Sequence, residues 1–250
     1  MQTIYEPKGA AREYAPFALN LYRGCAHGCT YCYAPLCLHM TRNNFADVSP
    51  RIGIIDALKT YLKKSIPKET VLLSFTSDPY QPIEQEVRLT REALEVMNGL
   101  VPHVAVLTKN IIVRDDFDII AHNGWTVGAT LTCYSPEYSE QYEPHAPLPA
   151  ERIRMLEDAE KHGIDTFISV EPVLSEAELE LVLQKIKHLK VKNGIRIGKW
   201  NHCSEANKIN WKSVLNTAIN YANSGKPIYI KDELAKFGNV PNNLRNKFFG

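Results

Sequence analysis

Three cysteines lie within eight residues near the start of the chain, at Cys25, Cys29 and Cys32. Their C-x3-C-x2-C spacing brings three thiolates together in one loop, which follows a short apolar segment at 17–21. Thiolates are the soft ligands that iron–sulfur clusters use, and two glycines in the loop let the backbone wrap closely around a bulky group. On a four-iron cluster, three ligands would leave one iron open to a substrate or cosubstrate.

Structural zinc is the alternative for the same cysteines, with His27 or His39 completing a Cys3His site. Zinc sites with such short spacings usually pair two C-x2-C halves, and this chain has no second half. Its other cysteines, Cys37, Cys133 and Cys203, are scattered. The zinc alternative would make the chain a non-catalytic binding module.

The composition is that of an ordinary globular protein. The chain has 250 residues, of which 44% are hydrophobic and 23% charged, and its net charge is +1. These values exclude a disordered or fibrous chain and give no broad attraction for phosphate backbones or anionic lipids. No apolar stretch approaches the roughly 18 residues of a membrane span, and the first residues lack a signal-peptide core. We therefore expect a cytoplasmic protein with no membrane partner, folded as one domain over residues 1–250.

Strand and helix patterns alternate along the chain. Short apolar runs predict buried strands, and the segments between them carry apolar residues at helical spacing. The predicted strands are 71–75, 103–108, 126–132, 166–172, 194–200 and 227–231; the predicted helices are 51–64, 88–100, 114–123, 149–163, 175–189 and 210–225. This α/β succession predicts a parallel sheet with right-handed crossovers, either as a partly closed barrel or as an open doubly wound sheet. In both, ligands bind at the carboxyl ends of the strands.

The cysteine loop NLYRGCAHGCTYCYAP, with the strand–helix alternation behind it, resembles the radical S-adenosylmethionine (SAM) superfamily. The resemblance implies a partial (β/α)6-type TIM-like barrel with a core over about 17–232, and we expect the basic segment 233–250 to dock on it. It also implies that Cys25, Cys29 and Cys32 bind a [4Fe–4S] cluster whose open iron chelates the methionine part of SAM. Reduction would then give methionine and a 5′-deoxyadenosyl radical, which abstracts hydrogen from a substrate.

Within the superfamily, residues 17–175 are most similar to the spore photoproduct lyase-like group. Besides the cysteine loop, the matching pieces are SFTSDPYQPIE, VLTKN, VGATLT and ISVEPV, each at or just beyond a predicted strand. In the lyase, a cysteine that returns hydrogen to the repaired thymine precedes the Thr-Ser-Asp step. Here Phe75 precedes that step, and a phenyl ring cannot donate this hydrogen. The resemblance therefore implies lyase-like machinery without implying photoproduct repair.

Polar residues after the predicted strands are the candidate cofactor contacts. Thr76, Ser77 and Asp78 follow the strand 71–75, where they either line the cofactor cleft or form a simple turn. Lys109 ends the strand 103–108. Its compact ammonium suits a single carboxylate, and the resemblance implies the methionine carboxylate of SAM, whereas the alternative is a solvated loop lysine.

The later strands contribute further candidates. Thr130 points to the same face as Thr132 and either bonds the ribose or fills the strand as a β-branched residue. Glu171 ends an apolar strand, where its carboxylate needs a partner: a ribose hydroxyl, the sulfonium, a substrate cation or a structural Lys or Arg. Tyr31 would pack near adenine, as in family members, or serve as a core aromatic. Cys133 is a weak candidate for a catalytic hydrogen donor, and a buried structural thiol is its alternative.

The resemblance also implies partners. A reductant such as flavodoxin or ferredoxin would supply electrons, and the substrate would bind through variable loops such as 133–149 and 200–208. Nucleic acid is a further candidate substrate because of the lyase-like motifs, although the nearly neutral charge does not favour it.

Overall fold

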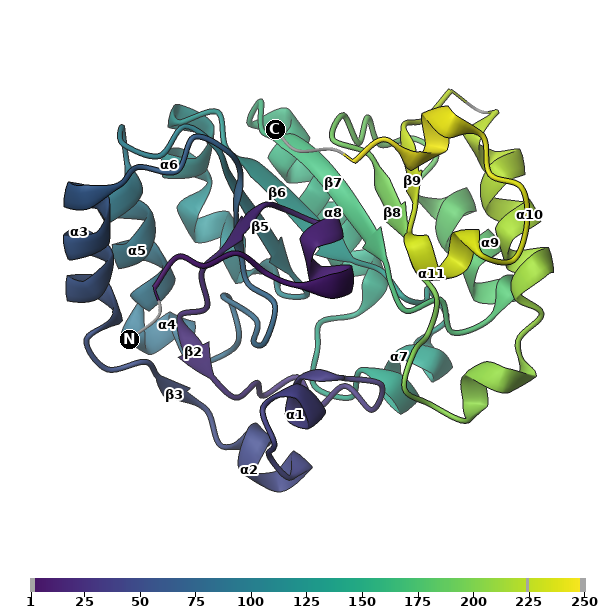
Figure 1. The fold of residues 1–250 in the computed structure, drawn as a ribbon, viewed down its shortest axis with the longest axis horizontal. Coiled ribbons are helices and arrows are strands. Elements are labelled where there is room, and N and C mark those ends of the chain that lie inside the picture. Colours follow the sequence, from purple (N-terminus) through teal and green to yellow (C-terminus); the bar gives the residue numbers. More distant parts are fainter. Residues whose placement is uncertain (1–2, 224, 248–250) are drawn as a thin grey trace.

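The computed structural model describes residues 3–223 and 225–247, and a seven-stranded sheet forms its centre (Figure 1). The strand order is β1-β4-β5-β6-β7-β8-β9, and each neighbouring pair is parallel. These strands are β1 (Phe17–Ala18), β4 (Val71–Leu73), β5 (Val104–Thr108), β6 (Thr126–Thr130), β7 (Asp165–Val170), β8 (Ile195–Ile197) and β9 (Ile228–Ile230). The sheet curls into a half-barrel, so the predicted partial TIM-like barrel is confirmed.

Helices cover the convex face of this sheet. Their bounds are α3 (Ile54–Lys64), α4 (Glu84–Val87), α5 (Leu89–Met97), α6 (Phe117–His122), α7 (Pro136–Tyr142), α8 (Pro149–Lys161), α9 (Glu176–Lys185), α10 (Trp211–Ala222) and α11 (Asp232–Ala235). Helix α3 shows why these segments are helical: Ile54, Leu58 and Leu62 recur at helical spacing and are buried, while Lys59 and Lys63 are exposed. The strands are apolar without alternation because helices cover one face and other residues fill the opposite face.

The amino-terminal segment fills the concave face of the half-barrel. A 3₁₀ turn, η1 (Gly9–Glu13), crosses in front of the strands (Figure 1). Tyr14 and Ala15 then form a small buried cluster with inward-facing residues of the sheet, among them Leu72 and Phe167. Nothing in the strand and helix pattern predicted this inner packing.

The cysteine loop lies on an extension below the barrel (Figure 1). The extension contains β2 (Tyr22–Arg23) paired antiparallel with β3 (Ser49–Pro50), and two short helices, α1 (Ala34–Cys37) and α2 (Arg42–Ala46). The remaining 3₁₀ turns are η2 (Ile111–Asp116), η3 (Glu205–Lys208) and η4 (Asn242–Arg245).

The ends of several elements differ from the predictions. The strand predicted at 71–75 stops at Leu73 and the one at 126–132 stops at Thr130, so the polar residues beyond them belong to loops. In the segment predicted to dock, Leu234 and Leu244 are buried, and residues 248–250 lie outside the described part of the chain. Within the described residues, no helix is long and apolar enough to cross a membrane.

Candidate functional site

The three cysteines of the motif line one small cavity. It has a volume of about 80 Å³, and Arg42 and Phe45 from α2 form part of its wall. Two backbone hydrogen bonds fix the loop: Cys25 N donates to Phe45 O at 2.9 Å, and Cys32 N donates to Cys29 O at 3.1 Å. The loop therefore presents all three thiols to the same space, as the spacing predicted.

Two glycines allow this loop to close. Gly24 has a φ of 81°, and a Cβ on it would lie 2.5 Å from Phe45 O. Gly28 has a φ of 65°, and a Cβ there would lie 2.9 Å from the imidazole ring of His145. A side chain at either position would collide with its neighbours in a backbone conformation that already disfavours one. The close wrapping expected from the sequence is therefore present.

Burial makes the three thiols poor acids. It raises the pKa of Cys25 to about 12 and that of Cys29 to about 11, and it also raises the pKa of Cys32. Because iron binds thiolates, loading a cluster here must release protons. Among the described residues, no three His, Cys, Asp or Glu side chains converge on one ion. This absence concerns a single ion; a cluster, if bound, would be held by the three cysteine thiolates.

Asp78 ties the cysteine loop to the sheet. Its Oδ2 lies 3.1 Å from Nε2 of His27, inside the loop, and accepts a hydrogen bond from Lys109 N at 2.8 Å. Its Oδ1 accepts from Thr108 Oγ1 at 2.6 Å and from Tyr80 N at 2.9 Å. Although burial by itself would raise it, His27 and these donors hold the pKa of Asp78 at about 2. The carboxylate thus joins the loops after β4 and β5 to the cysteine motif.

Both ring nitrogens of His27 lie close to oxygen atoms of the protein. Besides the contact with Asp78, its Nδ1 lies 3.3 Å from His145 O, and it is not among the residues that line the cysteine cavity. As a fourth zinc ligand it would have to leave both neighbours. The structure therefore does not support the Cys3His arrangement that uses His27.

A buried ion pair supports the loop from behind. Glu143 and Arg152 have fully buried side chains, and Oε2 of the first lies 2.6 Å from Nη1 of the second. Tyr31 donates to Oε1 of Glu143, as does Thr132 Oγ1 at 2.9 Å. Burial on its own would raise the pKa of Glu143, but Arg152 and Lys109 lower it below its ordinary value. The sequence predictions missed both members of this pair.

Lys109 faces the cysteine loop. Its ammonium lies 5.5 Å from the centre of the Tyr31 ring. Burial alone would lower the pKa of Lys109, but Cys29 and Glu143 raise it above the ordinary value. The side chain is therefore a cation held among buried groups, and the solvated loop lysine is the poorer description.

A second cavity adjoins the motif. It has a volume of about 180 Å³ and is lined by Tyr31 and Cys32, by Glu171 after β7, and by Lys199, Trp200 and His202 after β8. It therefore brings the last cysteine, the aromatic residue before it and the carboxyl ends of two strands to one space, which is where ligands bind in barrels of this kind.

Glu171 forms an ion pair with a lysine of the protein. Its Oε2 lies 2.6 Å from Lys231 Nζ and accepts a hydrogen bond from Tyr14 Oη at 2.7 Å. The backbone of Gly198 passes so close that a Cβ there would lie 2.7 Å from Oε1. Of the partners expected for this carboxylate, the lysine is the one observed. Neither Tyr14 nor Lys231 carried a signal in the sequence.

The other candidates occupy three different environments. Thr76 lines a third cavity, beside β1, while Ser77 O accepts a hydrogen bond from Ser74 Oγ at 2.9 Å. Thr130 is buried on the same face of β6 as Gly128, which packs on Phe167 inside the barrel.

Cys133 and Phe75 complete the candidates. Cys133 is buried in the core on the helix side, and burial raises its pKa to about 12. It lines none of the three cavities described here. The ring of Phe75 packs edge-on against Tyr14, with their centroids 6.0 Å apart. The position of the lyase's hydrogen-donating cysteine thus carries a packed phenyl ring.

Comparison with known proteins decides the family. A model of the radical SAM superfamily matches residues 19–196, which include the three cysteines, strands β4 to β7 and all but the last residue of β8. The chain belongs to the radical SAM superfamily. Enzymes of this superfamily bind a [4Fe–4S] cluster and SAM. This membership favours the predicted iron–sulfur site over the zinc module.

Two uncharacterized proteins are similar in sequence. One from Methanocaldococcus jannaschii is 26% identical over 175 residues, which cover 69% of this chain and 66% of the relative. One from Mycobacterium bovis is 27% identical over 178 residues, which cover 67% of this chain and 52% of the relative. The chain thus spans about half to two thirds of the length of these relatives.

Solved structures share the fold. A spore photoproduct lyase variant superimposes with a TM-score of 0.62 at 15% identity, covering 86% of this chain and 63% of the lyase. SuiB from Streptococcus suis, bound to S-adenosylmethionine, gives a TM-score of 0.61 at 11% identity and covers 89% of this chain and 52% of SuiB. At such low identity these matches establish a common architecture, in agreement with the lyase-like resemblance.

Proposed function

We propose that this radical SAM enzyme holds a [4Fe–4S] cluster on Cys25, Cys29 and Cys32 and uses it to cleave SAM. The observation that carries the proposal is the single cavity lined by all three thiols, in a loop that closes only because residues 24 and 28 are glycines. When bound and reduced, the cluster supplies the electron that splits the sulfonium of SAM into methionine and a 5′-deoxyadenosyl radical, which abstracts hydrogen from the substrate.

The chain's own residues would bind and orient SAM. Lys109, a buried cation beside Tyr31, is the proposed partner of the methionine carboxylate. Tyr31 lines the cavity next to Cys32, which supports a packing contact with adenine. The ion pair and the hydrogen bond observed for Glu171 both use Oε2, so we assign Oε1 to a ribose hydroxyl, with Thr130 as a second ribose contact.

Asp78 has a positioning role in this proposal. Its carboxylate accepts hydrogen bonds from Tyr80 N, Thr108 Oγ1 and Lys109 N, and through His27 it holds the cysteine loop against the sheet; its predicted cofactor contact stays a prediction. Thr76 and Ser77 stay predicted cofactor contacts, and Cys133 stays a predicted hydrogen donor. The amino-terminal segment would help to shield the site from water, because Tyr14 and Ala15 pack against Leu72 and Phe167 inside the barrel. Such shielding is needed where a reactive radical is formed.

Reconstitution without oxygen tests the proposal. Protein loaded with iron and sulfide and reduced with dithionite should convert SAM to 5′-deoxyadenosine, measured by liquid chromatography and mass spectrometry. Cys29→Ala should abolish this product, because a buried ligand is lost. Cys37→Ala is the matched control, since that thiol is exposed and outside the cavity. Equal product from the wild type and Cys29→Ala would contradict the assignment.

The partners follow from the chemistry. We propose a low-potential donor such as flavodoxin or ferredoxin as the physiological reductant, and an organic substrate. Nucleic acid as that substrate, a cytoplasmic location and a single domain over residues 1–250 all stay predictions.

A further inference from the structure

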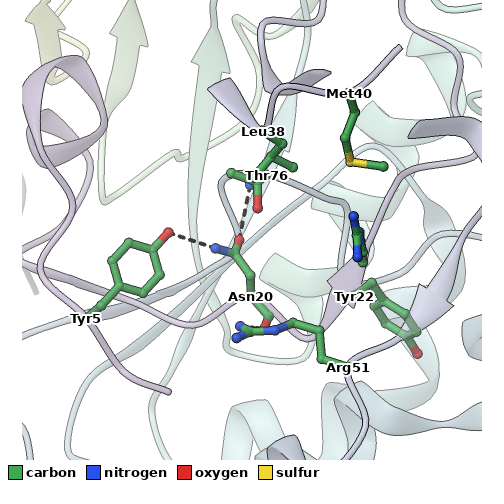
Figure 2. A pocket seen from close by; sticks show the side chains of 8 residues that line it. Tyr5, Asn20, Tyr22, Leu38, Met40, Arg51 and Thr76 are labelled. Atoms are coloured by element: carbon green, nitrogen blue, oxygen red, sulfur yellow. Dashed lines mark hydrogen bonds between the residues drawn. The ribbon is translucent and has the colours of Figure 1, made fainter. Parts of the chain in front are cut away.

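A cavity of about 410 Å³ lies between the end of β1 and the β2–β3 ribbon, distinct from the two cavities lined by the cysteines, and Thr76 is its one residue among the predicted cofactor contacts (Figure 2). Its walls come from five parts of the chain: the amino-terminal segment at Tyr5, the stretch from the end of β1 to β2, the segment after α1, the residue after β3, and the loop after β4. The volume is in the range of small-molecule binding sites. No residue of this cavity except Thr76 was a candidate in the sequence.

Two arginines give this cavity a positive charge. Arg23 is exposed on β2, and Arg51 is half-buried, with Nη1 donating to Asn20 O at 2.8 Å. Among the described residues that line the cavity, none is acidic. The whole chain carries a net charge of only +1, so this pairing is a local feature and does not follow from a basic composition. Guanidinium groups match the planar geometry of carboxylates and the oxygens of phosphates.

The rest of the lining is suited to a ligand with an apolar part. Leu38, which is 39% exposed, and Met40 form an apolar side. Figure 2 shows Tyr5 and Arg51 on either side of Asn20, with Thr76 beyond it. The hydroxyl of Tyr5 accepts from Asn20 Nδ2 at 2.7 Å, so its own proton can be donated to a ligand. Burial raises the pKa of Tyr5, which keeps that proton in place.

Hydrogen bonds connect this cavity to the cavity beside Cys32. Asn20 Oδ1 accepts from Phe75 N at 2.9 Å and from Thr76 N at 3.1 Å. The carbonyl of Phe75 in turn accepts from Tyr33 Oη at 3.0 Å, and Tyr33 lines the second cavity. Tyr33 and the segment 75–76 therefore stand between the two cavities, and a ligand held in one lies beside the other.

We infer that the cavity lined by Arg23 and Arg51 binds the phosphate or carboxylate group of a small organic substrate that also has an apolar part. One part of the inference rests on the proposed function, namely that the bound ligand is the substrate. It adds the substrate class that the radical chemistry leaves open. The arginines anchor the anion, while the apolar side receives the carbon skeleton.

Calorimetric titration tests the inference, with phenyl phosphate, benzoate and benzyl alcohol as probes. Anaerobically purified protein should bind at least one anionic probe. Its affinity for benzyl alcohol should be lower by about tenfold or more. The two anionic arms distinguish a phosphate from a carboxylate site. Arg23→Gln should weaken the anion about tenfold, since a charged hydrogen-bond donor is lost. Arg51→Gln, checked for folding by its melting curve, should weaken it at least as much.

Arg154→Gln is the matched control, because Arg154 is exposed on α8 and does not line the cavity. Its affinity should stay within about twofold of the wild type, a change too small to reflect a lost charged contact. The inference is overturned if neither anionic probe binds, if benzyl alcohol binds equally well, or if Arg23→Gln leaves the affinity unchanged. Since the titrations contain neither SAM nor reductant, their outcome is independent of SAM cleavage. Failure of 5′-deoxyadenosine formation would count against the proposed function alone.

Discussion

Replacing Glu143 by Gln should destabilise this protein more than any ordinary surface substitution. Glu143 and Arg152 are both fully buried, and their charges lie 2.6 Å apart. The glutamine keeps the shape and one oxygen that can accept from Tyr31 and Thr132. It removes the negative charge, however, and leaves the guanidinium buried without its counter-ion.

The expected cost is about 3–5 kcal/mol of unfolding free energy, the range found when one partner of a buried ion pair is removed. For a domain of ordinary stability, about 5–15 kcal/mol in total, this is a large fraction. The two hydrogen bonds that glutamine can still accept place the expectation toward the lower end of that range. The cysteine loop should loosen as well, because Tyr31 is anchored on the same carboxylate.

Urea unfolding followed by circular dichroism measures this cost, and iron content after anaerobic loading measures the effect on the loop. Glu140→Gln is the matched control, because Glu140 is an exposed residue of α7 three positions away. It should change the unfolding free energy by no more than about 0.5 kcal/mol. Arg152→Met, alone and combined with Glu143→Gln, completes a double-mutant cycle. We expect the double variant to be more stable than the sum of the two losses by about 2 kcal/mol or more.

Two outcomes would refute this reasoning. One is a cost for Glu143→Gln that does not exceed that of Glu140→Gln. The other is strict additivity in the cycle, which would mean that the two charges do not interact although they are in contact.

Two further predictions concern the loop and its attachment. Gly24→Ala should lower the unfolding free energy by about 2 kcal/mol more than Gly53→Ala, and it should also lower the iron content. Both glycines have a positive φ, but only a Cβ at position 24 would collide with Phe45 O. Equal losses of unfolding free energy in urea would contradict this prediction. For Asp78, the pKa of about 2 in the folded protein lies below the unfolded value of 3.8, so its contribution is present above pH 4 and is lost as the pH falls toward 2. The wild type should therefore lose about 2 kcal/mol of unfolding free energy over that range. In unfolding experiments at stepped pH, the unfolding free energy of Asp78→Asn should fall less steeply with acid. Equal slopes for the two proteins would contradict the prediction.

Much of the barrel could be predicted from the sequence because its signals are local. Apolar runs and helical spacing predicted the strands and helices within a few residues, since burial against a sheet imposes the same periodicity everywhere. The ends were less accurate: β4 stops at Leu73 and β6 at Thr130, because the loops at the carboxyl edge turn away before the apolar run ends. The cysteine motif was equally local, as three ligands within eight residues share one loop.

The supporting residues could not be predicted, because their partners are far apart in the sequence. Tyr31 meets Glu143 across 112 positions, and Lys231 meets Glu171 across 60. A buried glutamate or lysine has no spacing pattern of its own, and only the closed barrel brings it to its partner. For the same reason the contacts of Asp78 with His27 and with the loop after β5 could not be predicted, while its predicted contact with the cofactor stays a prediction.

By itself, the sequence determined the chemistry this protein carries: three thiols in one loop, on an alternating strand–helix chain. Only the tertiary structure decided what surrounds them. It packed the amino-terminal segment inside the barrel, paired Glu143 with Arg152 and Glu171 with Lys231, and placed two arginines at a cavity with one apolar side. The spacing of nearby residues predicts which of them share a helix or strand. The pairing of buried charged residues depends on contacts between elements, and the chain forms these only when it is folded.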